Sequence, residues 1–201
     1  MPRTALGLSA MFLFLAVGWR SFVQYRRTGD IGFRTPSRSA AFIERMAGAI
    51  LVIGTIGLLA SPLCAMVGVT QPLGALDRAA VRVLGLLAAC FGIAATVLAE
   101  FEMGDSWRVG VNPSETTSLV KQGLFSYIRN PIYSGMLLFA LGLFCLVPSP
   151  LSATAGVVFV LGIQLQVRGV EEPYLTHKHG PAYSEYARSA GRFLPRVGRL
   201  P

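Results

Sequence analysis

An uncharged run of 36 residues, Ile132–Val167 (IYSGMLLFALGLFCLVPSPLSATAGVVFVLGIQLQV), contains Pro148-Ser149-Pro150 near its middle. Each proline lacks an N–H and restricts the residue before it, so this triplet ends a helix. We therefore predict a tight helical hairpin with arms Ile132–Val147 and Leu151–Val167. A spanning helix needs roughly 20 apolar residues. Because both arms are shorter, we expect local bilayer thinning or shielding by neighbouring helices.

Three apolar stretches upstream of the hairpin are long enough to cross a bilayer: Ala5–Val23, Met46–Val69 and Ala79–Ala99. The 201-residue chain is 53% hydrophobic and 14% charged, whereas soluble domains carry about a quarter charged residues. The sequence therefore predicts an all-α polytopic membrane protein of about five transmembrane helices. It divides into an N-terminal membrane region, 1–99, and a region, 100–201, that holds a polar loop, the hairpin and the tail.

Single residues inside these spans carry further expectations. Arg20 lies near the end of the first span and is expected to snorkel to the interface. Gly85 and Gly92, seven residues apart in the third span, indicate close helix packing. His177 and His179 have no second pair of ligands, so no metal site is expected.

Basic residues are distributed unevenly about the five predicted spans. Of the 18 lysines and arginines, 15 fall on one side, the exceptions being Arg3, Arg78 and Arg82. By the positive-inside rule the N-terminus is outside and the C-terminus is cytoplasmic. The net charge of +8 thus reflects topology, and no nucleic-acid partner is needed to explain it. The Ala-, Gly-, Arg- and Leu-rich composition favours a bacterial inner membrane.

The polar loop of residues 100–121 faces the cytoplasm in this topology and leads to a second helix start. Asn130 is expected to cap the helix and Pro131 suits its first position. A helix N-terminus beside Arg129 can bind an anion such as a carboxylate. The plain alternative is an ordinary cap with a flanking anchor.

Glu171 and Glu172 follow the last apolar arm at the membrane edge, where charge is costly and tends to serve function. On a helix they point about 100° apart, so one could pair with Arg168 while the other meets a cationic or hydroxyl-rich ligand. Beyond them, a short helix is predicted from Pro181 to near Gly191. Its tyrosines are either interfacial anchors or part of a site.

Taken together, these segments resemble the isoprenylcysteine carboxyl methyltransferase family and its relatives, which include phospholipid N-methyltransferases. The family signature is R-H-P-x-Y-x-G at the start of a membrane helix, a hairpin, a Glu-Glu pair, G-x-x-Y-x-x-Y and a late proline. The matching residues, across roughly 100–196, are Arg129–Gly135 (RNPIYSG), Glu171, Glu172, Gly180, Tyr183, Tyr186 and Pro195.

The resemblance implies S-adenosylmethionine at a cytoplasmic pocket and a lipophilic acceptor that enters from the bilayer. The helix start suits the carboxylate of this cofactor, Glu171 suits its amine or ribose hydroxyls, and Phe125 could pack on adenine or near the sulfonium. The cofactor-binding residues that the resemblance implies are Thr117, Ser118, Leu119, Val120, Phe125, Arg129, Asn130, Pro131, Ile132, Tyr133, Glu171, Glu172, Tyr183 and Tyr186.

Asn130 replaces the histidine of the family signature and cannot titrate near neutral pH. Methyl transfer to a carboxylate needs no base, because the nucleophile is already ionised, so we expect no dedicated acid–base residue. In-line displacement requires alignment and exclusion of water. Arg168 or Arg108 is the expected partner of an anionic acceptor.

The leading hypothesis is an S-adenosylmethionine-dependent methyltransferase that acts on a lipophilic acceptor, by carboxyl O-methylation of an isoprenylcysteine-like group. Phospholipid N-methylation and thiol S-methylation are alternatives within this class. Membrane sterol reductases resemble the same half of the chain but use NADPH, a larger dinucleotide, and usually carry more spans. A non-catalytic transport or scaffolding role is disfavoured, because the predicted spans are almost free of polar groups and the polar residues gather at one face.

Overall fold

The computed structural model describes residues 1–34, 42–110 and 118–200, and within these ranges the regular structure is helical apart from isolated β-bridges. The first long helix begins with α1 (Pro2–Phe12), continues through the π-helical segment η1 (Leu13–Trp19) and ends with α2 (Arg20–Thr28). The remaining elements are α3 (Phe42–Met66), α4 (Ala79–Glu102), η2 (Gly104–Ser106), η3 (Gly123–Ser126), α5 (Pro131–Leu146), α6 (Pro150–Gln166), η4 (Val167–Glu171), α7 (Glu172–His179) and α8 (Pro181–Ser189).

Four helices are long and apolar enough to cross a membrane: Pro2–Thr28, Phe42–Met66, Ala79–Glu102 and Pro150–His179. α5 is apolar but has only 16 residues. The predicted all-α membrane class is confirmed, and the chain is an integral membrane protein with four candidate spans. A fifth span through α5 stays a prediction.

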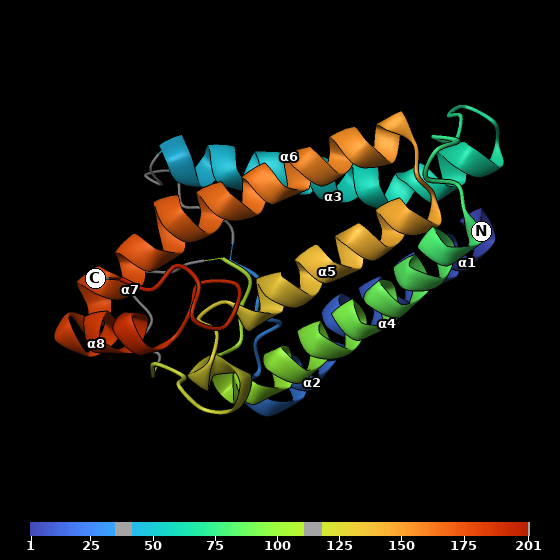
Figure 1. The fold of residues 1–201 in the computed structure, drawn as a ribbon. Coiled ribbons are helices and arrows are strands. Elements are labelled where there is room, and N and C mark those ends of the chain that lie inside the picture. The colour runs from blue at the N-terminus through green and yellow to red at the C-terminus, as the bar shows by residue number, and fades with distance from the viewer. Residues whose placement is uncertain (35–41, 111–117, 201) are drawn as a thin grey trace.

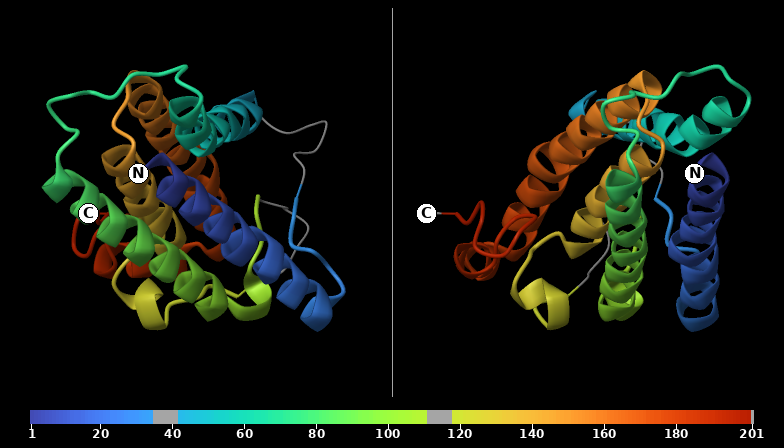
Figure 2. Two further views of the ribbon diagram at one scale, coloured as in Figure 1. Left: turned by 90° about the vertical axis from the view of Figure 1, so that its right-hand side faces the viewer. Right: turned by 45° about the vertical axis from the view of Figure 1, so that its right-hand side comes forward.

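α5 and α6 meet at a short turn. Ser149 caps α6, since its Oγ accepts a hydrogen bond from the amide of Ser152, and the Ser152 hydroxyl donates to the carbonyl of Val147 at 2.7 Å. From this turn the two arms diverge, because α5 packs along α4 while α6 packs along α3 (Figures 1 and 2). The predicted tight hairpin is therefore wrong beyond its turn, and each arm is shielded by a neighbouring helix.

Glycines set the close approach of both helix pairs. A Cβ added to Gly85 of α4 would lie 2.7 Å from the Cβ of Cys145 in α5, and one on Gly92 would overlap the backbone of Phe139. Between α3 and α6, a Cβ on Gly162 would lie 2.7 Å from the Cα of Leu51. The prediction that Gly85 and Gly92 permit close packing is confirmed.

One end of the bundle, called the polar end below, carries the short helices outside the spans. α7, α8 and η3 lie at this end, where α5 and α6 are far apart, and the N-terminus lies at the opposite end (Figure 1). The described residues of both polar segments of the sequence thus meet at the polar end.

Arg20 is buried at the polar end instead of reaching solvent. The residue is 1% exposed, and its guanidinium donates from Nη2 to the carbonyl of Gly104 at 2.6 Å and lies 4.6 Å above the ring of Trp107. The expected snorkelling of Arg20 is therefore wrong, since main-chain carbonyls and an indole ring replace water as its partners.

Candidate functional site

A cavity of about 330 Å³ opens at the polar end and extends between the apolar helices. This volume lies in the range of small-molecule pockets, roughly 300–1,000 Å³. The residues expected at the site that line it are Arg108, Ser118, Leu119, Val120, Phe125, Arg129, Asn130, Pro131, Ile132, Tyr133, Glu171, Tyr183 and Tyr186. Thr117 lies outside the described residues. Glu172 and Arg168 are not among the residues that line the cavity.

The start of α5 forms part of the cavity wall. Pro131 occupies the first turn as predicted, but the Asn130 side chain makes no cap hydrogen bond. Its Nδ2 instead donates to the carbonyl of Arg192 at 3.1 Å, which ties the helix start to the C-terminal tail. The expected asparagine cap is therefore wrong. The first amide groups of α5 receive no cap from Asn130, which leaves a helix N-terminus that favours an anionic ligand group.

Glu171 faces this helix start from η4. One oxygen, Oε1, accepts hydrogen bonds from the Tyr133 hydroxyl at 2.6 Å and from Nε2 of Gln166 at 3.2 Å. These two donors fix the carboxylate at the cavity wall. A fixed carboxylate of this kind suits an amine or a pair of hydroxyls on a ligand.

Aromatic residues form another part of the cavity wall, called the aromatic wall below: Phe125, Tyr183 and Tyr186. The Tyr186 hydroxyl donates to the carbonyl of Phe125 at 2.6 Å, and the Tyr183 and Tyr186 rings meet edge to face with centroids 6.2 Å apart. Tyr183 is only 2% exposed, and burial raises its pKa to about 12. Burial also raises the pKa of Tyr186, so both rings stay neutral at physiological pH. The two tyrosines are therefore buried cavity residues and not interfacial anchors.

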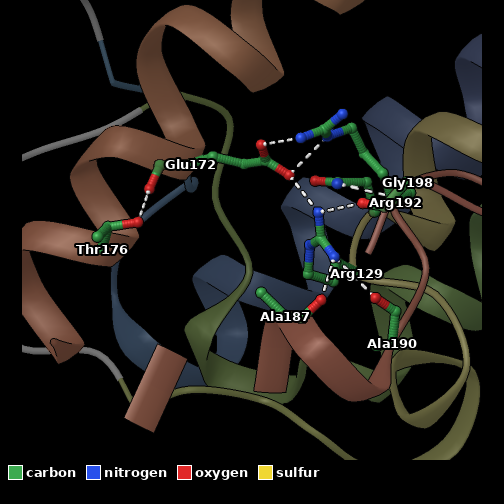
Figure 3. A network of polar contacts seen from close by, with 8 residues as sticks. Arg129, Glu172, Thr176, Ala187, Ala190, Arg192 and Gly198 are labelled. Atoms are coloured by element: carbon green, nitrogen blue, oxygen red, sulfur yellow. Dashed lines mark hydrogen bonds and ion pairs between the residues drawn. The ribbon is translucent and has the colours of Figure 1, made fainter. Parts of the chain in front are cut away.

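Arg129, Glu172 and Arg192 form a network of hydrogen bonds and ion pairs, called the clamp below (Figure 3). The clamp holds the C-terminal tail, residues 187–200. Arg129 donates to the carbonyls of Ala187 and Ala190 at 2.9 and 2.7 Å and to the Glu172 carboxylate at 2.8 Å. Arg192 donates to both Glu172 oxygens, at 2.8 and 2.9 Å. Glu172 thus pairs with arginines distant in sequence, and the alternative of a local partner in Arg168 does not apply to it.

The two candidate acceptor arginines lie in different surroundings. Arg168 is exposed. Arg108 lines the cavity, and its positive charge has a favourable electrostatic interaction with the carboxylate of Glu171. The structure therefore brings Arg108, and not Arg168, to the other predicted site residues.

Some polar and aromatic residues at the cavity were not identified from the sequence. Glu100 and Trp107 line the cavity directly, and Gln166 acts through Glu171. The positions of Glu100 and Gln166 could have pointed to the site, because a carboxylate or an amide near the end of an apolar span is costly and tends to serve function.

Comparison with known proteins decides the family. A family model described as phospholipid methyltransferase matches residues 80–182, about half of the chain. The chain belongs to the phospholipid methyltransferase family. The matched region contains α4 from its second residue, α5 and α6 and reaches past Glu171, whereas Tyr183 and Tyr186 lie just beyond it. The family is one of membrane methyltransferases, as the sequence resemblance indicated.

Two curated relatives from Arabidopsis thaliana are similar to this member of the phospholipid methyltransferase family. Protein-S-isoprenylcysteine O-methyltransferase A is 33% identical over 89 residues, and protein-S-isoprenylcysteine O-methyltransferase B is 32% identical over 89 residues. In both cases the aligned part covers 44% of this chain and 45% of the relative. The chain therefore spans just under half the length of these relatives.

Proposed function

We propose that this protein is an S-adenosylmethionine-dependent methyltransferase that acts on a lipophilic acceptor. The observation that carries the proposal is one cavity, in which an uncapped helix start, Glu171 and an aromatic wall are continuous with apolar residues from the spanning helices. Five spans, with the N-terminus outside and the cavity mouth in the cytoplasm of a bacterial inner membrane, complete the proposal.

The residues of the polar end fit the cofactor group by group. The start of α5 at Ile132 suits the cofactor's carboxylate, and Glu171 suits its amine or ribose hydroxyls. Phe125, Tyr183 and Tyr186 offer apolar rings for the adenine. Every group of this set is buried or half-buried, so the ligand would be held away from bulk water.

Bound S-adenosylmethionine would supply an electrophilic methyl group for transfer to a heteroatom of the acceptor. The protein's contribution is to align the two reactants in a water-excluded cavity. The fixed carboxylate of Glu171 and the rigid start of α5 provide that alignment.

For the acceptor, the names of the two plant relatives support an isoprenylcysteine-like carboxylate, with Arg108 as its partner in the cavity. The family's description supports a phospholipid, whose head group would be methylated on nitrogen. A thiol acceptor has no comparable support.

The test is a titration of purified protein in lipid nanodiscs with S-adenosylhomocysteine and, separately, with NADPH. We expect saturable binding of S-adenosylhomocysteine and none of NADPH. A labelled methyl group from S-adenosylmethionine should then enter the lipid-soluble fraction. Binding of NADPH alone would replace the proposal with a reductase, and binding of neither by folded protein would remove the catalytic assignment.

A further inference from the structure

Arg20 is a buried cation in the first long helix and lies outside residues 80–182, which match the family model. Its guanidinium donates from Nε to the carbonyl of Glu100 at 3.3 Å and from Nη2 to the carbonyl of Gly104 at 2.6 Å. It also makes a cation–π contact with Trp107, 4.6 Å from the centroid of the ring. Charge inside a membrane span is costly and tends to serve function, so these contacts indicate a role beyond anchoring the helix.

The N-terminal part of the chain also holds the loop on both sides of Trp107. Before Trp107, the carbonyl of Asp105 accepts a hydrogen bond from Nε2 of Gln24 at 2.9 Å. After it, the amide of Val109 donates to the carbonyl of Gly32 at 2.8 Å. A Cβ added to Gly32 would overlap the Trp107 ring, so the backbone and the ring are in direct contact. The position of this ring therefore depends on residues of the first long helix and the chain that follows it.

Trp107 lies where the apolar part of the cavity begins. It is 3% exposed and lines the cavity. Ala16 and Thr96 also line the cavity, and they lie about one helical turn before Arg20 and Glu100, towards the apolar interior of the bundle (Figure 1). The groups proposed for the cofactor belong instead to α5, η3, η4 and α8. The part of the cavity beside Trp107 thus suits the acceptor.

We propose that Arg20 is a positioning residue for the methyl acceptor, because it holds Trp107 in the part of the cavity wall that this acceptor contacts. The inference rests on the proposed function and adds the part of the chain that receives the acceptor. Loss of the Arg20 guanidinium should leave the cofactor site in place, since the Glu171 carboxylate is held by Tyr133 and Gln166.

The first measurement needs no acceptor. Trp19 and Trp107 are the two tryptophans of the chain, so in a Trp19→Phe background the fluorescence of protein in nanodiscs reports Trp107 alone. Arg20→Met should raise the acrylamide quenching constant at least about threefold, because a loop that loses contacts opens more often. Arg26→Met, at an exposed arginine of the same helix, is the matched control and should leave quenching unchanged. Unchanged quenching in Arg20→Met would overturn the inference.

The second measurement compares the KM of the acceptor with the Kd of S-adenosylhomocysteine, and a merely structural defect would change both. The acceptors are N-acetyl-S-farnesylcysteine and dioleoylphosphatidylethanolamine, which represent the two acceptor classes of the proposed function. For each acceptor that wild-type protein methylates, Arg20→Met should raise KM at least about tenfold, the factor expected for one lost charge-assisted hydrogen bond. The Kd should stay within about threefold of wild type. Arg26→Met should change neither value.

Two further variants test the route through the loop. Gln24→Leu removes a neutral hydrogen bond to the same loop, keeps Arg20, and should raise KM about threefold with an unchanged Kd. Trp107→Leu should raise KM like Arg20→Met, and the double variant should stay within about twofold of the larger single effect, because residues that act through one another are not additive.

The outcomes separate this inference from the proposed function. A wild-type KM in Arg20→Met, single effects that multiply in the double variant, or a Kd that rises in parallel with KM would each overturn the role of Arg20. If Arg20→Met does not fold, a wild-type KM in Gln24→Leu overturns it. Wild-type protein that binds no S-adenosylhomocysteine, or methylates neither acceptor, would instead overturn the proposed function on which the inference rests.

Discussion

Replacing Arg129 by methionine removes the centre of the tail clamp while preserving most of the side-chain length. Arg129 donates hydrogen bonds to Ala190, Glu172, Ala187 and Gly198 at 2.7, 2.8, 2.9 and 3.0 Å. In the variant, Glu172 keeps Arg192 as a partner, so its charge is not left alone. The main loss is at the carbonyls of the tail.

The magnitude follows from those carbonyls. A buried acceptor left without a donor costs about 1–3 kcal/mol. The carbonyl of Ala190, at a buried position, loses its Arg129 donor, whereas the carbonyl of Ala187 keeps the amide of Leu200 as a donor at 3.0 Å. Since about 1.4 kcal/mol is a factor of ten, the population with a detached tail should rise about tenfold or more.

Limited proteolysis with chymotrypsin in nanodiscs measures this population, because Phe193 lies within the clamped tail. When opening is fast relative to cleavage, the cleavage rate follows the open population. Arg199→Met, at an exposed arginine of the same tail, is the matched control and should cleave like wild type. Equal cleavage rates for Arg129→Met and Arg199→Met would refute the clamp.

Two further substitutions probe the helix contacts and the cavity wall. Gly142→Val should lower the thermal inactivation temperature, because its Cβ would overlap the backbone of Ala89 and overpacking costs about 1–3 kcal/mol or more. Gly156→Val is the control and should leave the temperature unchanged, because a Cβ there has no atom within 4 Å. Equal inactivation temperatures for the two variants would contradict the close contact. Tyr186→Phe should weaken S-adenosylhomocysteine binding about fivefold through loss of its roughly 1 kcal/mol hydrogen bond to Phe125. Tyr127→Phe, at an exposed ring, should leave the Kd unchanged. Equal Kd values for Tyr186→Phe and Tyr127→Phe would contradict a specific role for Tyr186.

The positions of the apolar helices could be predicted from sequence because hydropathy and proline act locally. Ala79–Ala99 was expected and Ala79–Glu102 is observed, and the turn at Pro148 to Pro150 is where the sequence places it. The divergence of α5 from α6 could not be predicted in this way. It depends on which neighbouring helix each arm packs against, and the glycine contacts that set this choice join residues far apart in sequence.

The sequence identified cavity residues that belong to a local motif. It did not identify contacts that a side chain makes with residues distant in the chain. Glu171 was expected at the ligand, and it lines the cavity. Asn130 was expected to cap α5, but the carbonyl of Arg192 takes its side chain. Glu172 and Arg129 were grouped with the cofactor residues; both hold a tail whose position no local pattern specifies, and Arg129 also lines the cavity while Glu172 does not. Glu100 was assigned only to the polar loop, because a single carboxylate beside an apolar span gives no partner to reason from.

The adjacent glutamates allow the most direct test of the proposed cofactor site, because Glu171 lines the cavity and Glu172 belongs to the clamp. The measurement is the Kd of S-adenosylhomocysteine for wild type, Glu171→Gln and Glu172→Gln in nanodiscs, with chymotrypsin cleavage as the check on the tail. We predict that Glu171→Gln weakens binding at least about tenfold with an intact tail, since a charge-assisted hydrogen bond contributes about 1.5–3 kcal/mol. Glu172→Gln should loosen the tail and weaken binding less. An unchanged Kd for Glu171→Gln would contradict the assignment of this cavity to S-adenosylmethionine.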